Sequence, residues 1–433
     1  MQISVEATTA LERRMTIGLP AEKIDAEVEK RLLDSARRVR IDGFRPGKVP
    51  ASVVRQRYGA GIRHEVVSDV MRSSFVEAVT KEKLKLAGVP EVVPTKDTAG
   101  EPFEFTATFE VYPELKLATF DKYKFVRQST EVTDADVDKM LETLQEQRAT
   151  YSPVKRKSKK ADQVTCNFVG KIDGEEFEGG KAEDAKIILG SGQMIPGFET
   201  GIKGMKTGDE QTITVTFPKD YQAEELAGKE AQFDVTVTEV GAPQFPALDE
   251  EFFKSFHSGA TDVEGFKVDV KANMTRESRQ ALAGVLKTAV VDSLIASNEF
   301  DVPKALVDDE IDRLRQQAVQ QYGGGKMDPS SLPAELFQEQ AVRRVKVGLI
   351  MSDIISTHEL KADDAAVTAY LEDMAAVYQE PASVIEYYRN NPEQMSQVQA
   401  VVIEEAVIQK VLSASKVTEK AVKYDDAIKL ARG

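Results

Sequence analysis

The sequence predicts a multidomain α+β protein. Its 433 residues exceed what one ordinary hydrophobic core organises, so two to four domains are expected. The character of the chain changes along its length: helices and strands mix over 1–112, glycine and β-branched residues dominate 150–245, and long helical patterns fill 246–433. Residues 113–149 form a connector that we expect to pack with the C-terminal region.

The first 112 residues predict an α+β domain. Alternation of apolar and polar residues over 1–19 predicts strands, and Pro20 and Pro50 each precede a helical run. Residues 103–111 alternate strictly and predict the clearest strand of the chain. The apolar stripe of the second helical run consists of Val54, Tyr58, Ile62, Val66 and Val70.

Residues 150–245 predict a small antiparallel sheet with one helix packed against it. Short β-branched segments are separated by glycines, and Asp173-Gly174 is a hairpin turn signal. The stretch "MIPGFETGIKGM" at 194–205 is the one short helical candidate. The run "KRKSKK" at 155–160 is typical of a solvated linker, with a second contact for anions as the alternative.

The C-terminal residues 246–433 predict an all-α region with projecting arms, and Thr133 in the connector is a plausible helix N-cap. A stripe of Val307, Ile311, Leu314 and Ala318 illustrates the helical period. Mixed surfaces of apolar and polar residues suit promiscuous binding of unfolded segments, although a buried helical core would explain the same residues. The candidates for such a surface are Met327, Leu332, Leu336, Phe337 and Met374.

Composition excludes several kinds of site. Cys166 is the single cysteine, so the chain forms no internal disulfide and no cysteine-rich metal site. His64, His257 and His358 are far apart in the sequence, and no phosphate-binding loop or nucleophile motif occurs. We therefore expect neither metal nor cofactor. The N-terminus lacks the basic start and apolar run of a secretory signal, so we expect a cytoplasmic protein that does not bind membranes.

Charge is distributed unevenly. The chain carries a formal net charge of -15, with 57 Lys+Arg and 72 Asp+Glu. Residues 37–63 nevertheless contain only one acid, Asp42, which indicates a local contact with a polyanion or, alternatively, a solvated helix face. The basic residues of this patch are Arg37, Arg38, Arg40, Arg45, Lys48, Arg55, Arg57 and Arg63.

The stretch "GFRPGKVP" at 43–50 resembles the ribosome-docking signature of the bacterial trigger factor family, Gly-Phe-Arg-x-Gly-Lys-x-Pro. The resemblance implies docking on the large ribosomal subunit at the exit tunnel, against a rim protein and ribosomal RNA. Arg45 and Lys48 would form charge-assisted hydrogen bonds there, and Phe44 would add an apolar anchor. The implied ribosome-binding residues are Gly43, Phe44, Arg45, Pro46, Gly47, Lys48 and Pro50.

The middle region, from "VGKIDGEEFEGG" to "TFPKDY", resembles an FKBP-type prolyl isomerase domain. The resemblance implies that Phe198 forms the floor under a proline ring and that Tyr221 offers a hydroxyl to a substrate carbonyl. Glu178 replaces the usual Asp and Ala185 a usual aromatic residue, which bears on the catalytic rate. The implied catalytic residues are Phe168, Phe177, Glu178, Met194, Ile195, Phe198, Tyr221 and Phe233.

The order of these regions is similar to trigger factor along essentially the whole chain. The resemblance implies an ATP-independent, ribosome-associated chaperone with prolyl isomerase activity. Its partners would be nascent and unfolded polypeptides, and a second copy of the chain when free, but not DNA. Two alternatives remain at this point: a prolyl isomerase without a general chaperone role, and an RNA-binding protein that uses the patch at 37–63.

Overall fold

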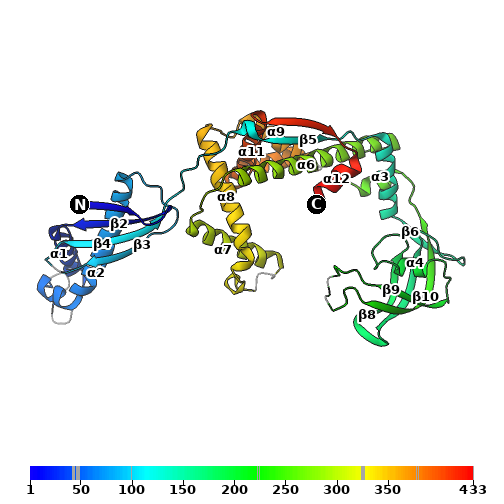
Figure 1. The fold of residues 1–433 in the computed structure, drawn as a ribbon, viewed down its shortest axis with the longest axis horizontal. Coiled ribbons are helices and arrows are strands. Elements are labelled where there is room, and N and C mark those ends of the chain that lie inside the picture. The colour runs from blue at the N-terminus through cyan, green and yellow to red at the C-terminus, as the bar shows by residue number, and fades with distance from the viewer. Residues whose placement is uncertain are drawn as a thin grey trace. The chain divides into compact units, whose positions relative to one another are not determined.

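The computed structural model describes residues 1–40, 44, 49–98, 100–221, 223, 225–322, 327–376, 378 and 380–432 (Figure 1). It divides into two compact units. The first contains Met1–Arg127 and Val285–Thr418, and the second contains Gln128–Gly284 and Glu419–Gly433. Each unit combines segments that are far apart in the sequence.

The first unit begins with a four-stranded antiparallel sheet in the order β1-β2-β4-β3. The strands are β1 (Gln2–Ala7), β2 (Glu12–Leu19), β3 (Glu91–Lys96) and β4 (Phe103–Glu110). Two helices, α1 (Ala21–Arg38) and α2 (Ala51–Lys81), share one core with this sheet (Figure 1). Alternate residues of β4 are buried, which confirms the strand predicted over 103–111.

The stripe predicted on α2 is only partly right, because Tyr58 is exposed. A step of four residues turns a helix by about 400°, so a strict four-residue stripe drifts away from the core within a few turns. Burial accordingly continues on neighbouring positions in the second half of the helix. The buried residues of α2 are Val54, Ile62, Val66, Val67, Val70, Ser74, Phe75 and Ala78.

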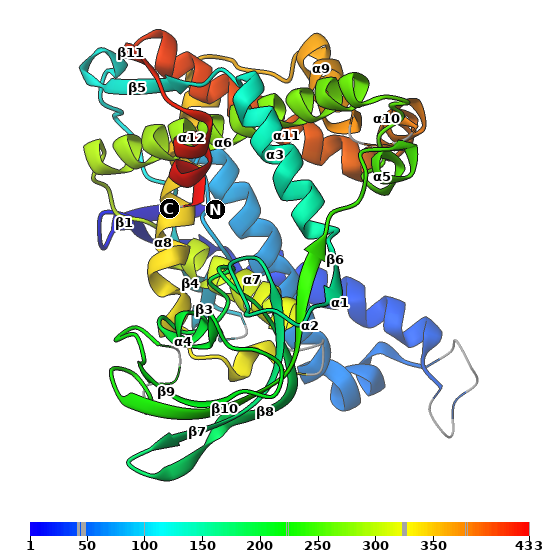
Figure 2. The same cartoon turned by 90° about the vertical axis from the view of Figure 1, so that its right-hand side faces the viewer.

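The second unit contains the predicted small sheet, in the order β6-β10-β7-β8 with β9 paired to β10. All of its pairings are antiparallel. The strands are β6 (Thr150–Pro153), β7 (Gln163–Ile172), β8 (Glu175–Ile188), β9 (Glu210–Thr216) and β10 (Glu230–Gln244). They curve around the short helix α4 (Phe198–Ile202) (Figure 2).

The turn between β7 and β8 is the predicted Asp173-Gly174 pair. Both residues have positive φ, 52° and 88°. Two consecutive positive φ values are typical of the type I′ turn, whose twist matches that of the strands it joins. The helix expected within 194–205 is shorter than predicted, because Gly197 has a φ of 95° and α4 starts only after it.

A helical core completes the second unit. It joins α3 (Asp134–Gln147), α5 (Glu250–Ser255), the first half of α6 (Val263–Ser297) and α12 (Tyr424–Arg432). Phe253 and Phe266 stack at its centre with ring centroids 4.6 Å apart. The predicted N-cap of α3 is confirmed: the Thr133 hydroxyl accepts a hydrogen bond from the Asp136 N–H, and the Asp136 carboxylate accepts one from the Thr133 N–H.

The rest of the first unit is mainly helical, as predicted, and it also contains the first residues of both strands of a two-stranded ribbon that continues into the second unit. The ribbon pairs β5 (Lys124–Ser129) with β11 (Lys416–Ala421). The helices are α7 (Lys304–Tyr322), α8 (Glu335–Thr357), α9 (Asp364–Ala375), α10 (Pro381–Asn390) and α11 (Pro392–Ser413), with the short 3-10 turns η1 (Phe120–Lys122) and η2 (Pro329–Ser331).

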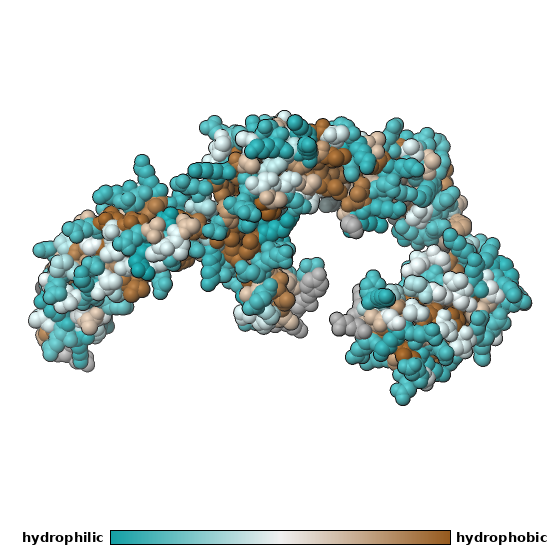
Figure 3. Space-filling model, viewed as in Figure 1, coloured by the Kyte–Doolittle hydropathy of each residue, from teal (hydrophilic) through white to brown (hydrophobic). Residues whose placement is uncertain are grey.

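The helical part buries three of the four residues of its predicted stripe, with Ala318 half-buried, and also leaves apolar residues on its surface. Val307, Ile311 and Leu314 pack with Ala341 between α7 and α8. Of the five candidates for an adaptable surface, Met327 and Leu336 are exposed. Leu332, Phe337 and Met374 are half-buried, so they serve partly as core. Figure 3 shows apolar side chains interspersed with polar ones on the surface of the helical part.

Among the described residues, α6 alone is long and apolar enough, by length and composition, to cross a membrane. Some of its apolar residues pack into hydrophobic cores, whereas others, such as Val268, are exposed. Phe266, Val270 and Met274 belong to the helical core of the second unit, and Val290 and Leu294 to a core of the first.

Candidate active site

Three buried aromatic rings meet inside the curved sheet of the second unit. Phe168 of β7 lies 5.3 Å from Phe198 of α4 and 5.9 Å from Phe233 of β10, measured between ring centroids. Phe198 and Phe233 are 5.2 Å apart. All three pairs are edge-to-face, the arrangement that aromatic quadrupoles favour. Phe198 is fully buried, so it supports the site from below.

A second set of rings leads from this cluster to the surface. Phe177 of β8 contacts Phe233 and Phe217, each at a centroid distance of 6.0 Å. Phe217 lies 4.8 Å from Tyr221, which is 37% exposed. Tyr221 therefore presents a phenol at the solvent-facing end of a continuous aromatic cluster. We call these six residues the aromatic cluster: Phe168, Phe177, Phe198, Phe217, Tyr221 and Phe233.

Glycine makes room for the Phe177 ring. A Cβ on Gly170 would lie 2.7 Å from the Cε1 atoms of both Phe177 and Phe233, closer than carbon atoms approach. A Cβ on Gly180 would lie 2.8 Å from the Phe177 Cζ. Phe177 thus packs directly on the backbone of β7 and β8. The glycines in these strands serve close packing and not only flexibility.

The loop between β8 and α4 carries Met194 and Ile195, which are half-buried against the same core. Glu199 organises this loop. Its carboxylate accepts hydrogen bonds from the Gly190 N–H at 2.6 Å, the Ser191 hydroxyl at 3.1 Å and the Met194 N–H at 3.4 Å. Partial burial raises the pKa of Glu199, but these bonds outweigh it and hold the pKa below its usual value.

Sequence reasoning missed two residues of this arrangement. Phe217 follows β9 directly and connects Phe177 to Tyr221; the alternation of Ile213 and Val215 with polar residues extends to it and could have revealed it. Glu199 could not be singled out, because nothing in the sequence shows that its carboxylate turns back to the loop before it. Glu178, a predicted site residue, is exposed beside Phe177.

The chemistry of the cluster is apolar. Within the described part of the chain, no group of three or more His, Cys, Asp or Glu side chains is arranged to hold a metal ion. Cys166 of β7 is buried, and burial raises the pKa of its thiol to about 11, so it remains protonated at neutral pH. The arrangement can enclose an apolar group beside a phenolic hydroxyl.

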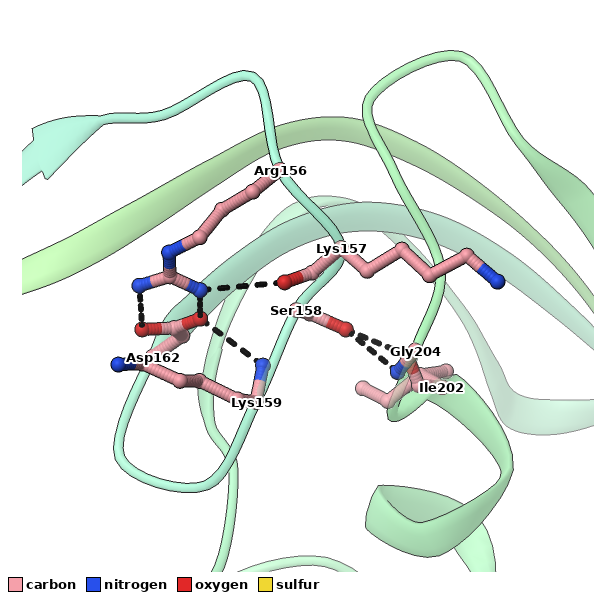
Figure 4. Close-up of polar contacts among 7 residues, drawn as sticks. All are labelled: Arg156, Lys157, Ser158, Lys159, Asp162, Ile202 and Gly204. Carbon is pink, nitrogen blue, oxygen red and sulfur yellow. Dashed lines mark hydrogen bonds and ion pairs between the residues drawn. The ribbon is translucent and has the colours of Figure 1, made fainter.

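The run 155–160, predicted to be a solvated linker, is instead an ordered loop (Figure 4). Asp162 is fully buried and accepts two hydrogen bonds from the Arg156 guanidinium and one from the Lys159 N–H. Ser158 is also buried, and its hydroxyl bonds the Ile202 carbonyl at 3.0 Å and the Gly204 N–H at 2.9 Å. The linker interpretation was wrong because charge density along the chain does not show which polar groups turn inward.

Comparison with known proteins now assigns the chain. Family models match it as bacterial trigger factor protein over 1–144, as FKBP-type peptidyl-prolyl cis-trans isomerase over 154–238 and as bacterial trigger factor protein C-terminus over 262–413. A trigger factor of Stutzerimonas stutzeri (strain A1501) is 53% identical, covering 100% of this chain and 99% of the relative. The chain belongs to the trigger factor family. A trigger factor of Pseudomonas syringae pv. syringae (strain B728a) is 51% identical, over 99% of this chain and 98% of the relative.

A solved structure reported for promiscuous substrate recognition in the folding and assembly activities of the trigger factor chaperone is also similar. It is 16% identical, covers 95% of this chain and 99% of that chain, and aligns with a TM-score of 0.49. As a member of the trigger factor family, the chain is a chaperone that contains an FKBP-type prolyl isomerase domain.

The trigger factor signature at 43–50 lies largely outside the described residues, which exclude Gly43, Arg45, Pro46, Gly47 and Lys48. Phe44 is described and is 40% exposed. Pro50, the last residue of the signature, is the N-cap residue of α2. Val49, at the second variable position of the signature, is buried in the core of the N-terminal sheet and helices, so it anchors this end of the loop.

The basic patch of this trigger factor family member is less cationic than its sequence indicates. Arg37 pairs with Asp34 and Arg55 with Glu29, while Arg63 pairs with both Asp25 and Asp97. Most of these acids belong to α1, which lies beside α2, so they are close in space although they fall outside 37–63. These pairs offset part of the positive charge that the sequence of the patch indicates.

Proposed function

We propose that this trigger factor family member docks on the large ribosomal subunit beside the exit tunnel through residues 43–50, against a rim protein and ribosomal RNA. Its helical part holds nascent and unfolded chains, and its aromatic cluster isomerises their X–Pro bonds. The observation that carries the isomerase assignment is the aromatic cluster itself, which runs from the buried Phe198 to the exposed Tyr221.

The isomerase step needs no nucleophile. Resonance across the amide sets a rotation barrier of about 18–20 kcal/mol, and the twisted amide in the transition state has lost this resonance and its charge separation. An apolar surface favours the less polar twisted amide over the planar one. Phe177, Met194 and Ile195 supply this surface, and Phe168, Phe198 and Phe233 fix its shape from behind.

Tyr221 offers a polar group at the exposed end of the cluster. Its hydroxyl would donate a hydrogen bond to a carbonyl flanking the proline and so orient the peptide. We expect Tyr221→Phe to lower kcat/KM on a proline-containing tetrapeptide about tenfold, the effect of one hydrogen bond of about 1.4 kcal/mol. The control is Tyr151→Phe in β6 of the same domain, which should leave kcat/KM unchanged. Equal kcat/KM values for wild type and Tyr221→Phe would contradict this role of the hydroxyl.

Docking is tested by co-sedimentation with purified bacterial ribosomes. The triple variant Phe44→Ala, Arg45→Ala, Lys48→Ala should stay in the supernatant under conditions in which the wild type pellets. A matched control changes one exposed aromatic residue and two arginines of the same region: Tyr58→Ala, Arg38→Ala, Arg57→Ala. Pelleting of both variants like the wild type would refute docking by 43–50.

The remaining parts of the proposal concern organisation. The division into domains at 1–112, 113–149, 150–245 and 246–433 follows the change in sequence character, and the matched family ranges support the limits of the isomerase domain. We also propose a cytoplasmic chaperone that binds neither membranes nor DNA and forms a homodimer when free of ribosomes. Sedimentation velocity over a range of protein concentrations tests the dimer, because a monomer at all concentrations would exclude it.

A further inference from the structure

The isomerase domain carries a group of cations for which the described residues provide no acidic partner. Six exposed lysines occupy two segments, one before β7 and one between α4 and β9. Within the described part of the chain, none of their ammonium groups forms an ion pair. We call them the Lys surface: Lys155, Lys157, Lys159, Lys160, Lys203 and Lys206.

Hydrogen bonds hold the two segments together. Besides its hydroxyl bonds to Ile202 and Gly204, Ser158 donates its N–H to the Met205 carbonyl at 2.9 Å and accepts the Gly204 N–H on its carbonyl at 3.0 Å. Lys157 and Lys159 flank Ser158, and Lys203 lies between its two partners. The lysines are therefore gathered by a fixed backbone and not by a flexible run.

Among the described residues, the acids of these segments form no ion pair with the Lys surface. Asp162 is buried and committed to Arg156, and the Asp209 carboxylate accepts the Lys206 backbone N–H at 2.8 Å. Figure 4 shows the Lys157 and Lys159 side chains extending to opposite sides of the loop. Positive charge therefore lies on two sides of this loop, on a chain whose formal net charge is -15.

We propose that the Lys surface binds the phosphate backbone of RNA without reading its sequence. Lysine ammonium groups are compact point charges that suit phosphates, and the one arginine of the loop, Arg156, is used internally. A densely and uniformly charged polymer such as RNA can contact cations on both sides of the loop, whereas acidic residues on proteins are interspersed with cations. That the RNA in question is ribosomal RNA near the docking site rests on the proposed function. The ability of the Lys surface to bind RNA does not depend on it.

The test measures fluorescence anisotropy of a labelled 20-nucleotide oligouridylate, as a function of salt, with the full chain. All proteins carry Phe44→Ala, Arg45→Ala and Lys48→Ala, so the docking loop contributes nothing. The Lys-surface variant adds Lys157→Gln and Lys203→Gln. The matched control adds Lys219→Gln and Lys229→Gln, two exposed lysines of the same domain at the other end of β9.

We expect the Lys-surface variant to lower the slope of log K against log salt by about 1.4, which corresponds to about 0.7 for each lost phosphate contact with a single strand. The control should keep the slope of its parent. Equal slopes for all three proteins would overturn the proposal, as would equal losses in both variants. A variant that loses binding to poly-glutamate but not to RNA would assign the surface to an acidic protein instead. Unchanged isomerase activity shows that the Lys-surface variant is folded.

Discussion

The carboxylate of Glu199 lies 2.6 Å from the backbone nitrogen of Gly190, nine residues earlier in the chain. This bond closes a loop that contains three glycines with positive φ, Gly190, Gly192 and Gly197, and therefore has little conformational preference of its own. Glu199 is a positioning residue for Met194 and Ile195 in this loop, since it bonds the Met194 N–H as well.

Glu199→Ala should free the loop. We expect amide hydrogen exchange at Gly190 and Met194 to accelerate about tenfold or more and isomerase kcat/KM to fall, at a cost of about 1–3 kcal/mol for the unsatisfied groups. Glu199→Gln, which keeps one acceptor oxygen, should restore part of both. The control is Glu230→Ala on the exposed end of β10. Exchange rates that match the wild type would contradict this role.

The pH dependence of the loop follows from the same bonds. Because the pKa of Glu199 is held below its usual value, the carboxylate stabilises the folded loop at all pH values above the usual glutamate pKa. That stabilisation is lost as the pH falls through the lower, folded pKa. Exchange protection at Gly190 and Met194, corrected for the intrinsic rate, should therefore be the same at pH 5 and pH 7. A loss of protection between these values would show that the pKa of this carboxylate is raised in the fold and not lowered.

Gly170→Ala should disturb the aromatic cluster. The added Cβ would meet both Phe177 and Phe233, which have to move and so change the surface offered to a proline. We expect a loss of about 1–3 kcal/mol in the free energy of unfolding, from denaturant titration, together with a fall in kcat/KM. Gly259→Ala is the control, because a Cβ there meets nothing within 4 Å. Wild-type stability and activity in Gly170→Ala would refute this packing.

Asp162→Asn should destabilise the loop at 155–162. Burial raises the pKa of Asp162, but hydrogen bonds from Arg156 and the Lys159 N–H, together with their charges, hold it below the usual value. The carboxylate therefore stabilises the fold above about pH 4 and loses this effect as the pH falls through its folded pKa. We expect Asp162→Asn to lower the free energy of unfolding by about 1–3 kcal/mol at pH 7. The loss is limited to this range because Arg156 is partly exposed, so that its charge stays hydrated without the carboxylate. The difference in unfolding free energy between this variant and the wild type should shrink towards pH 2. A difference that stays constant with pH would contradict the stabilising role of the Asp162 carboxylate.

Cys166 should be inert in the folded protein. Its thiol is buried and its pKa is raised to about 11, so the reactive thiolate is scarce and inaccessible. A thiol reagent at pH 8 should therefore label the chain only when it unfolds, which makes the labelling rate a measure of opening of the isomerase sheet. Rapid labelling of the native chain would show that β7 is exposed.

Local patterns predicted much of this fold. The alternation over 103–111, the cap at Thr133 and the turn at Asp173-Gly174 each depend on a few neighbouring residues, and each is observed. The aromatic site residues came from resemblance to a family. Of these, Phe168, Phe177, Phe198, Tyr221 and Phe233 do lie in one cluster. Their catalytic roles stay predictions.

What the sequence could not predict depends on contacts between distant segments. Arg63 counts as a free cation until Asp25 and Asp97 are seen beside it. Ser158 lies in a run of cations yet turns into the core to meet Ile202, 44 residues later. Charge counted along a chain is thus a poor guide to charge on a surface, because pairing and burial are decided by the fold.

The strands β6 and β10 begin and end the isomerase sheet, and they pair with each other, Pro153 opposite Gly241 and Thr150 opposite Gln244. The chain therefore leaves this domain next to the point at which it came in. Such a domain can be removed or inserted as one unit. Joining residue 149 to residue 245 would need only a short connecting segment and would leave the order of the surrounding helices unchanged. Gain, loss or exchange of the isomerase in related chains then requires only one local splice in the polypeptide.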